Sequence, residues 1–316
     1  MLAKNKAKER PKWLFYLLLG VVIIVWGFDP VVNKLQYENY SPLALSIIST
    51  LFSSILFFIL SIKKLKQINL KFLKIALPIG VLNSVACILQ RIGLQLTTPS
   101  SYAFLEHLSC AFVPIAIYLF TKKRPTFIQL ITIVVCIVGC FLISGLIKGF
   151  SSISVGDLLC AIAGAILGFC IALVSIYGKQ TDTTLLTFVQ MISYFVISVI
   201  FAFILNKVKI NGVIAEEFRF SFNPIHIIFA IAFGLFSVGL CWLFRNMALC
   251  RINPIFVAVV SPFSAIISSA ISVMLKMENI TVELIIGGVL ISVAVIISGI
   301  GDNKEMIFKQ RRKNHG

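Results

Sequence analysis

Charge is scarce in this chain of 316 residues. Asp, Glu, Lys and Arg together make up 13% of it, about half of the share that is usual for a soluble domain. Hydrophobic residues make up 59%, and the mean hydropathy is +1.01. This composition excludes a water-soluble protein and indicates a chain that uses lipid as its solvent.

The chain also lacks the short motifs of nucleotide and metal chemistry. It contains no G-x-G-x-x-G, no P-loop and no H-E-x-x-H. Its eight cysteines all fall within apolar segments and form no C-x-x-C pair. Buried cysteine usually packs as a small apolar residue. We therefore expect no disulfide, no metal site and no cofactor, and an ATP-driven pump is disfavoured.

Long apolar segments are what the sequence does contain. Each of ten segments is close to the roughly 20 residues that span a bilayer as a helix. The connections are short and marked by turn or charge signals, such as "TTPSS" at 97–101 and "TKKRP" at 121–125. We predict an all-α integral membrane protein with ten transmembrane helices, at about 13–33, 42–62, 71–95, 100–120, 126–147, 155–177, 184–205, 224–249, 253–275 and 282–301.

Basic residues divide unequally between the two sides of this predicted bundle. Twenty Lys and Arg residues fall on the side of the N-terminus and six on the other side. Cytoplasmic loops carry the excess of positive charge, so we expect both termini to be cytoplasmic, in the plasma membrane of a bacterium. The net charge of +16 then marks loops that face anionic lipid headgroups rather than a nucleic-acid surface.

The two halves of the chain resemble one another. A shift of 154 residues brings 122–145 over 276–299, with a Lys at the start and Ser-Gly at the end of both segments. Each half contains five spans, so the second half enters the membrane upside down. We predict two inverted five-helix repeats, at 1–150 and 151–316, with a substrate site between them near the middle of the membrane.

Three segments resemble a known family. They are "VWGFDPVVNK" (25–34), "GDLLCAIAGAILGF" (156–169) and "RNMALCRINPIFVAVVSPFSAII" (245–267). The chain is similar along its whole length to the drug/metabolite transporter superfamily, in its EamA-like branch. The resemblance implies a ten-helix carrier of small solutes.

Five ionisable residues lie inside the predicted spans: Asp29, Arg91, Glu106, His107 and Arg245. Each costs roughly 2.5–3.5 kcal/mol to insert, so each is expected to have a partner or a function. The third and fourth spans form a tight hairpin that brings Arg91 near Glu106. We predict that Glu106 faces a central cavity and contacts Arg91 directly or through water, either as a structural staple or as part of a substrate site.

Helical spacing divides the other candidates. Asn83, Cys87 and Gln90 share one face of the third span, and Tyr102 shares a face with Glu106. His107 is about 100° round from Glu106, so we expect it to face a neighbouring helix. Other interpretations remain open for Asp29 as an interfacial helix-end residue, for Arg245 as a snorkelling anchor, and for Trp26 and Trp242 as interfacial aromatics. The candidate substrate-binding set is Trp26, Asp29, Asn83, Gln90, Arg91, Tyr102, Glu106, His107, Trp242 and Arg245.

A carboxylate and a guanidinium close together suit a zwitterion. We therefore expect a transporter that moves a small polar solute by alternating access, with amino-acid export as one form of that activity. The partners expected are this solute and membrane lipids, with protons as a further candidate, and the chain is expected to be a monomer or a homodimer. The alternatives are an intramembrane enzyme and a non-transporting sensor.

Overall fold

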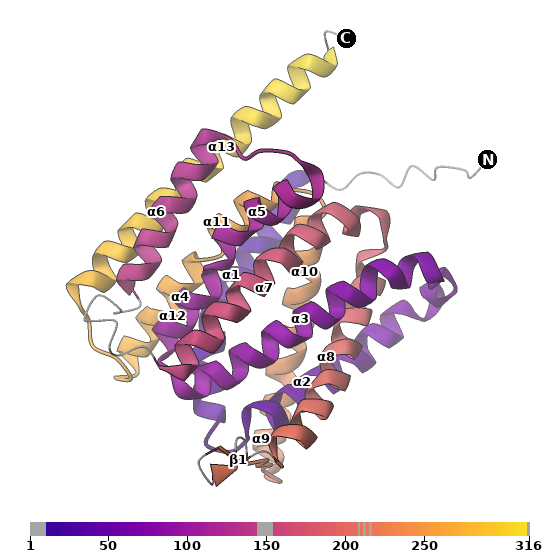
Figure 1. Ribbon diagram of the computed structural model, residues 1–316, viewed down its shortest axis with the longest axis vertical. Coiled ribbons are helices and arrows are strands. Elements are labelled where there is room, and N and C mark those ends of the chain that lie inside the picture. Colours follow the sequence, from indigo (N-terminus) through magenta and orange to yellow (C-terminus); the bar gives the residue numbers. More distant parts are fainter. Residues whose placement is uncertain (1–10, 144–153, 208, 211–212, 215–216, 315–316) are drawn as a thin grey trace.

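The computed structural model describes residues 11–143, 154–207, 209–210, 213–214 and 217–314. It is a bundle of helices that run roughly alongside one another (Figure 1). Within the described residues, eight helical segments are long and apolar enough to cross a membrane, and two shorter apolar helices cover 127–142 and 282–298. These ten segments coincide with the ten predicted spans, and the predicted fold class is confirmed.

The first half of the chain supplies five spans. They are α1 (Lys12–Gln36), α2 (Pro42–Ser61) followed by the 3-10 turn η1 (Ile62–Gln67), α3 (Leu70–Leu96), α4 (Pro99–His107) together with α5 (Ser109–Thr121), and α6 (Phe127–Ile143).

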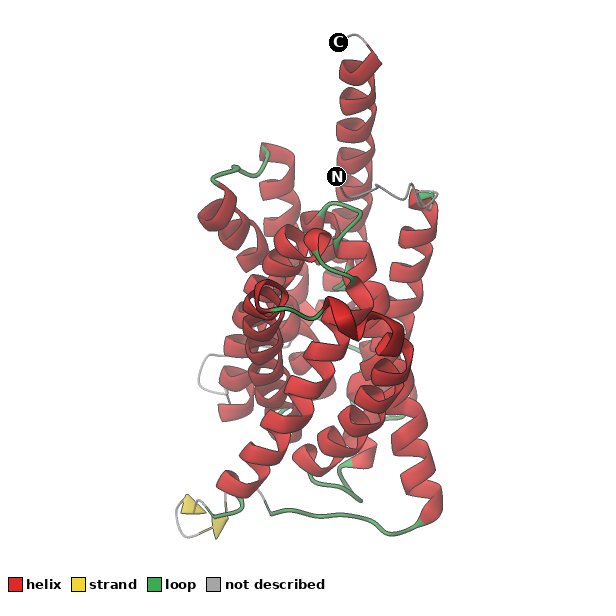
Figure 2. Ribbon diagram, turned by 90° about the vertical axis from the view of Figure 1, so that its right-hand side faces the viewer, coloured by secondary structure: helices red, strands yellow, loops and turns green. Residues whose placement is uncertain are grey.

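The second half repeats this order. It consists of α7 (Val155–Tyr177) with the turn η4 (Gly178–Gln180), α8 (Thr183–Leu205), the paired two-residue strands β1 (Lys209–Ile210) and β2 (Val213–Ile214), α9 (Pro224–Phe233), the π-helical segment η5 (Gly234–Leu240), α10 (Cys241–Leu249), α11 (Pro254–Val260), α12 (Phe263–Met274) and α13 (Val282–Asn314). The end of α13 projects beyond the bundle at the end opposite the strands (Figure 2).

Several helix starts follow signals that are visible in the sequence. At each of them a polar side chain caps the first turn and Pro occupies the first helical position, where its missing N–H costs no hydrogen bond. These cap and proline pairs are Ser41-Pro42, Thr98-Pro99, Asn223-Pro224 and Asn253-Pro254.

The packing of helices follows the repeat. α2 packs against its counterpart α8, and α6 packs against its counterpart α13 (Figure 1). Likewise α1 packs against α12 as α7 packs against α5, and α1 packs against α10 as α7 packs against α3. Exchanging the halves leaves this set of contacts unchanged, which is the pattern that an inverted repeat produces.

The fourth and ninth spans are both interrupted. α4 ends at His107 and α5 begins after Leu108, while α11 ends at Val260 and α12 begins after Pro262. Leu108 and Pro262 are 154 residues apart, which is the shift of the repeat. Interrupted helices at corresponding positions of two halves are typical of the substrate region of secondary transporters.

Small residues of α7 bring the interrupted fourth span close. A Cβ on Gly168 would lie 2.8 Å from the Ser109 carbonyl oxygen, and one on Gly164 would collide with the Leu105 carbonyl. Only glycine allows the two backbones to approach so closely. The G-x-x-x-G of α7 therefore fixes the position of the fourth span, with Gly164 against α4, the helix that carries Glu106, and Gly168 against α5.

Candidate solute-binding site

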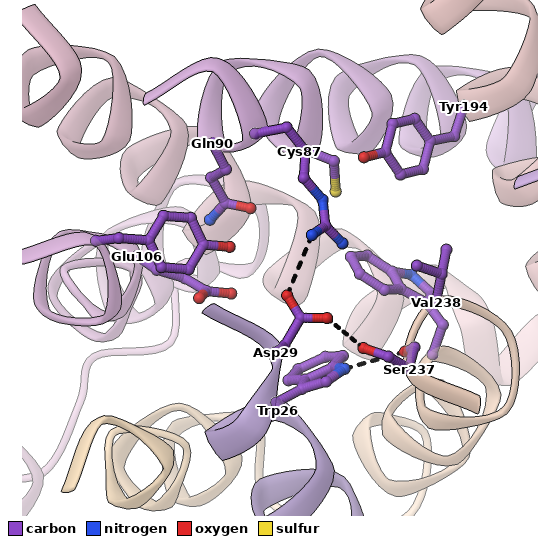
Figure 3. Close-up of a pocket in the computed structure, with 11 residues that line it drawn as sticks. Trp26, Asp29, Cys87, Gln90, Glu106, Tyr194, Ser237 and Val238 are labelled. Atoms are coloured by element: carbon purple, nitrogen blue, oxygen red, sulfur yellow. Dashed lines mark hydrogen bonds and ion pairs between the residues drawn. The ribbon is translucent and has the colours of Figure 1, made fainter. Parts of the chain in front are cut away.

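A small polar cavity lies among α1, α3, α4, α8 and the segment formed by η5 and α10 (Figure 3). It encloses about 30 Å³, which is room for one or two water molecules. Seven of the ten candidate residues line it: Trp26, Asp29, Gln90, Arg91, Tyr102, Glu106 and Trp242. The rest of the wall comes from Cys87, Tyr194, Ser237 and Val238.

Asp29 is the most heavily bonded group of the cavity. It is buried, and its Oδ2 lies 3.3 Å from Nη1 of Arg91. Asn33 Nδ2 donates to the same oxygen at 2.6 Å, and the Ser237 hydroxyl donates to Oδ1 at 2.5 Å (Figure 3). The interpretation of Asp29 as an interfacial helix-end residue is therefore wrong, because its carboxylate is held inside the bundle by Asn33 of the same helix and by residues of two other spans.

Glu106 was predicted to contact Arg91 directly or through water, and the direct form of this contact is wrong. The hairpin argument considered only the third and fourth spans. In the structure α1 packs against both α3 and α4, and its Asp29 reaches Arg91 instead. The Arg91 guanidinium is further surrounded by the hydroxyl groups of Tyr37 and Tyr194.

Glu106 lies on the cavity wall, where its helical face placed it. It lies near Gln90 (Figure 3), and Tyr102, one turn earlier on α4, is its hydrogen-bond partner. The charges nearest to it are those of Asp29, Arg245 and Arg91. In the part of the chain that the structure describes, no ion pair engages its carboxylate, so this charge remains available to a solute.

His107 and Asn83 are not part of the cavity wall. The imidazole Nε2 of His107 lies 2.9 Å from the Ser264 hydroxyl of α12, so it faces a neighbouring helix as expected. This bond joins the two interrupted spans beside their breaks. Asn83 is fully buried one turn from Cys87, to whose sulfur its amide donates at 3.9 Å.

Arg245 lies deep in the bundle, which contradicts its interpretation as a snorkelling anchor. Its guanidinium carbon is 4.4 Å from the centre of the Trp242 ring and 5.4 Å from that of Trp26, and the residue is only 3% exposed. The two indole rings are 5.5 Å apart, and the guanidinium lies against both of them inside the bundle. Contacts of a cation with two aromatic faces partly replace its hydration.

The π-helical segment before α10 changes the face of the helix on which Arg245 lies. A π turn contains more residues than an α turn, so it rotates every residue that follows it. Gly234, at the start of this segment, packs directly on Ser49, and Ser53 donates to its carbonyl at 3.3 Å. Regular helical spacing cannot anticipate that rotation, and it also missed Ser237. Tyr194 was missed as well, although a tyrosine in the middle of an apolar span is a detectable signal.

Ten apolar helices in two inverted halves around a central polar cavity define a membrane protein with the architecture of a secondary transporter. The model of the EamA-like transporter family matches residues 11–145 and, a second time, residues 154–300. The chain belongs to this family, and the predicted resemblance is confirmed.

Two relatives illustrate the range of similarity. Over 279 residues the chain is 24% identical to an uncharacterized transporter of Archaeoglobus fulgidus, covering 88% of this chain and 83% of that protein. A crystal structure of a protein superposes with a TM-score of 0.68 at 14% identity, covering 90% of this chain and 98% of the other. That second likeness concerns the fold alone.

Proposed function

We propose that this protein carries a small polar organic solute, an amino acid or a related metabolite, across the membrane by alternating access. The proposal rests on the charges of the cavity. Asp29 balances Arg91, which leaves the Glu106 carboxylate on the wall to attract an ammonium group. The Arg91 guanidinium also lies on the wall, and a solute carboxylate would bind it in exchange for part of its ion pair with Asp29.

The size of the cavity supports a mechanism in which the two halves move. Ligand pockets usually measure about 300–1,000 Å³, and this one encloses about 30 Å³. A solute as large as an amino acid therefore requires the lining helices to separate. Such a separation of helices is a step in the cycle of a carrier. An enzyme instead needs a nucleophile or a metal beside its substrate.

Contacts between the halves hold both ends of the bundle together. At one end the turn between α3 and α4 is bonded to the second half, because Thr97 donates to Asp157 at 2.5 Å and the Ser100 amide donates to Glu278 at 3.2 Å. At the other end Lys64 forms an ion pair of 2.8 Å with Asp182. Alternating access would release one of these sets of contacts while retaining the other.

For the orientation, we propose a bacterial plasma membrane with both termini in the cytoplasm. Three spans separate the connection at 217–223 from the C-terminus. Alkaline phosphatase fused after Phe222 is therefore expected to be active outside the cell, and a fluorescent protein at the C-terminus is expected to be fluorescent inside. Finding both positions on the same side would contradict this topology.

A transport screen in proteoliposomes tests the proposed function. Labelled amino acids are offered with and without a pH gradient, beside analogues that lack only the ammonium or only the carboxylate. We expect saturable transport of zwitterions and about tenfold weaker competition by the single-charge analogues, because a charged hydrogen bond contributes about 1.5–3 kcal/mol. Fluxes equal to those of empty liposomes for all solutes would favour the sensor or enzyme alternative.

A further inference from the structure

A second group of polar side chains lies one helical turn beyond the cavity, toward the end that carries Lys64 and Asp182. Three cavity-lining residues, one on each of α3, α8 and α10, have a polar neighbour four residues away, which is about 6 Å along a helix. The neighbours are Asn83 beside Cys87, Gln190 beside Tyr194, and Asn246 beside Trp242.

These neighbours lie at the same depth because the three helices share one end there. The Lys64–Asp182 pair holds the beginnings of α3 and α8 together. The end of α10 reaches the same region, where the Cys250 sulfhydryl donates to the carbonyl of Val174 near the end of α7. Asn83, Gln190 and Asn246, with Arg245 beside them, therefore form one polar layer.

The polar layer is buried but incompletely hydrogen-bonded. Asn83, Gln190 and Asn246 are 0% exposed and Arg245 is 3% exposed. Asn246 Nδ2 donates to Gln190 Oε1 at 2.6 Å and to Thr187 Oγ1 at 3.0 Å. Five side-chain atoms have no hydrogen-bond partner among the described residues: Asn83 Oδ1, Gln190 Nε2, Asn246 Oδ1, and Nε and Nη2 of Arg245.

Unpaired polar atoms at this burial are costly. Each costs roughly 1–3 kcal/mol, and apolar side chains of similar shape would avoid that cost. Buried polar groups in proteins are nearly always bonded, so a concentration of exceptions calls for a ligand or water to complete it. The pattern therefore indicates a site that is completed by a polar group from outside the chain.

The charge of the layer indicates which group that is. Arg245 forms no ion pair in the described part of the chain, and the acid that lies near enough to interact with it is Glu106 of the cavity. Its Nε and Nη2, together with Gln190 Nε2, are donors without acceptors. A planar guanidinium with adjacent N–H groups matches a carboxylate.

We propose that the polar layer of Asn83, Gln190, Arg245 and Asn246 is a second binding subsite that takes a carboxylate group between the central cavity and the Lys64–Asp182 end of the protein. The identity of the transported solute rests on the proposed function, whereas the binding of a carboxylate does not. In a carrier, such a subsite would hold the solute after it leaves the cavity on that side.

Tryptophan fluorescence tests the subsite without any transport measurement. The chain has three tryptophans, and Trp13 is 63% exposed. The Trp13→Phe protein retains only the two that contact Arg245. Titration of this purified protein with sodium acetate is expected to give a saturable change in emission, and methylammonium chloride at the same ionic strength is expected to give none.

Removing the amides of the layer should weaken acetate binding specifically. In the Trp13→Phe background, Gln190→Leu combined with Asn246→Leu is expected to raise the acetate dissociation constant at least about tenfold, because the free Gln190 Nε2 donor and the amide that is bonded to Gln190 are both removed. If the double variant does not fold, Gln190→Met alone is used, with the same direction expected. The matched control is Ser198→Ala. The Ser198 hydroxyl is equally buried and has no hydrogen-bond partner among the described residues, and it lies one turn from Tyr194 in the direction away from Gln190.

Two results would overturn the subsite. One is the absence of a saturable change with acetate, which would make the layer a hydrated structural core only. The other is unchanged acetate affinity in the amide variants, which would place acetate in the central cavity. If the protein transports solutes but acetate binding does not depend on the polar layer, only the subsite is refuted. If acetate binds to the layer but no solute is transported, only the proposed function is refuted.

Discussion

Replacing Glu106 with Gln is expected to reduce transport by about 10- to 100-fold in kcat/KM while the protein still folds and inserts. Gln retains the size of the side chain and a hydrogen bond with Tyr102, but it loses the charge that attracts an ammonium group. The lost charge-assisted bond contributes about 1.5–3 kcal/mol. Uptake by proteoliposomes, normalised to the amount of inserted protein, measures the effect.

Folding should be little affected because Arg91 keeps its partner Asp29. The matched control is Glu38→Gln, since Glu38 is exposed and lies in the turn after α1; it should transport normally. A monodisperse Glu106→Gln protein with wild-type transport would remove Glu106 from the site. A variant that unfolds more easily but transports normally would assign Glu106 a structural role.

Asp29→Asn is expected to lower the free energy of unfolding by about 3–5 kcal/mol, the usual cost of leaving one member of a buried ion pair alone. The substitution retains the shape of the side chain but leaves the Arg91 guanidinium without its counter-charge. Reversible unfolding in mixed micelles measures the loss. Arg91→Gln should cost less, because Asn33 and Ser237 still donate to the Asp29 carboxylate.

A surface ion pair provides the comparison. Asp182→Asn removes the charge that meets Lys64, whereas the Asn side chain can still cap α8, as Asp182 does by accepting from the Thr184 amide. Both partners are partly exposed, at 38% and 26% of their side chains, so we expect a loss of less than about 1 kcal/mol. If Asp29→Asn is no more damaging than Asp182→Asn, the buried pair does not stabilise the fold as described.

The interrupted spans could have been recognised before the structure was known. Pro262 breaks the ninth span because proline removes a backbone donor and clashes with the preceding turn. Applying the 154-residue shift to it gives Leu108, the break of the fourth span. No proline marks the break at Leu108. The 154-residue repeat predicts it, whereas regular helical spacing does not.

The sequence by itself determined the ten spans and where most of them begin, although α13 continues to Asn314, beyond the predicted end at residue 301. A chain in lipid must satisfy its own backbone hydrogen bonds, so apolar length and capping pairs such as Asn253-Pro254 are sufficient to locate each span. It also determined which ionisable residues have to be accounted for, because charge is so expensive in the membrane.

Only the tertiary structure decided how these residues are paired. Arg91 lies against Asp29 rather than Glu106 because α1 packs across the hairpin of α3 and α4. Arg245 is buried against two tryptophans rather than exposed on the outside of the bundle because a π-helical segment rotates the residues after it. Both outcomes depend on contacts between segments far apart in the chain, which no local pattern encodes.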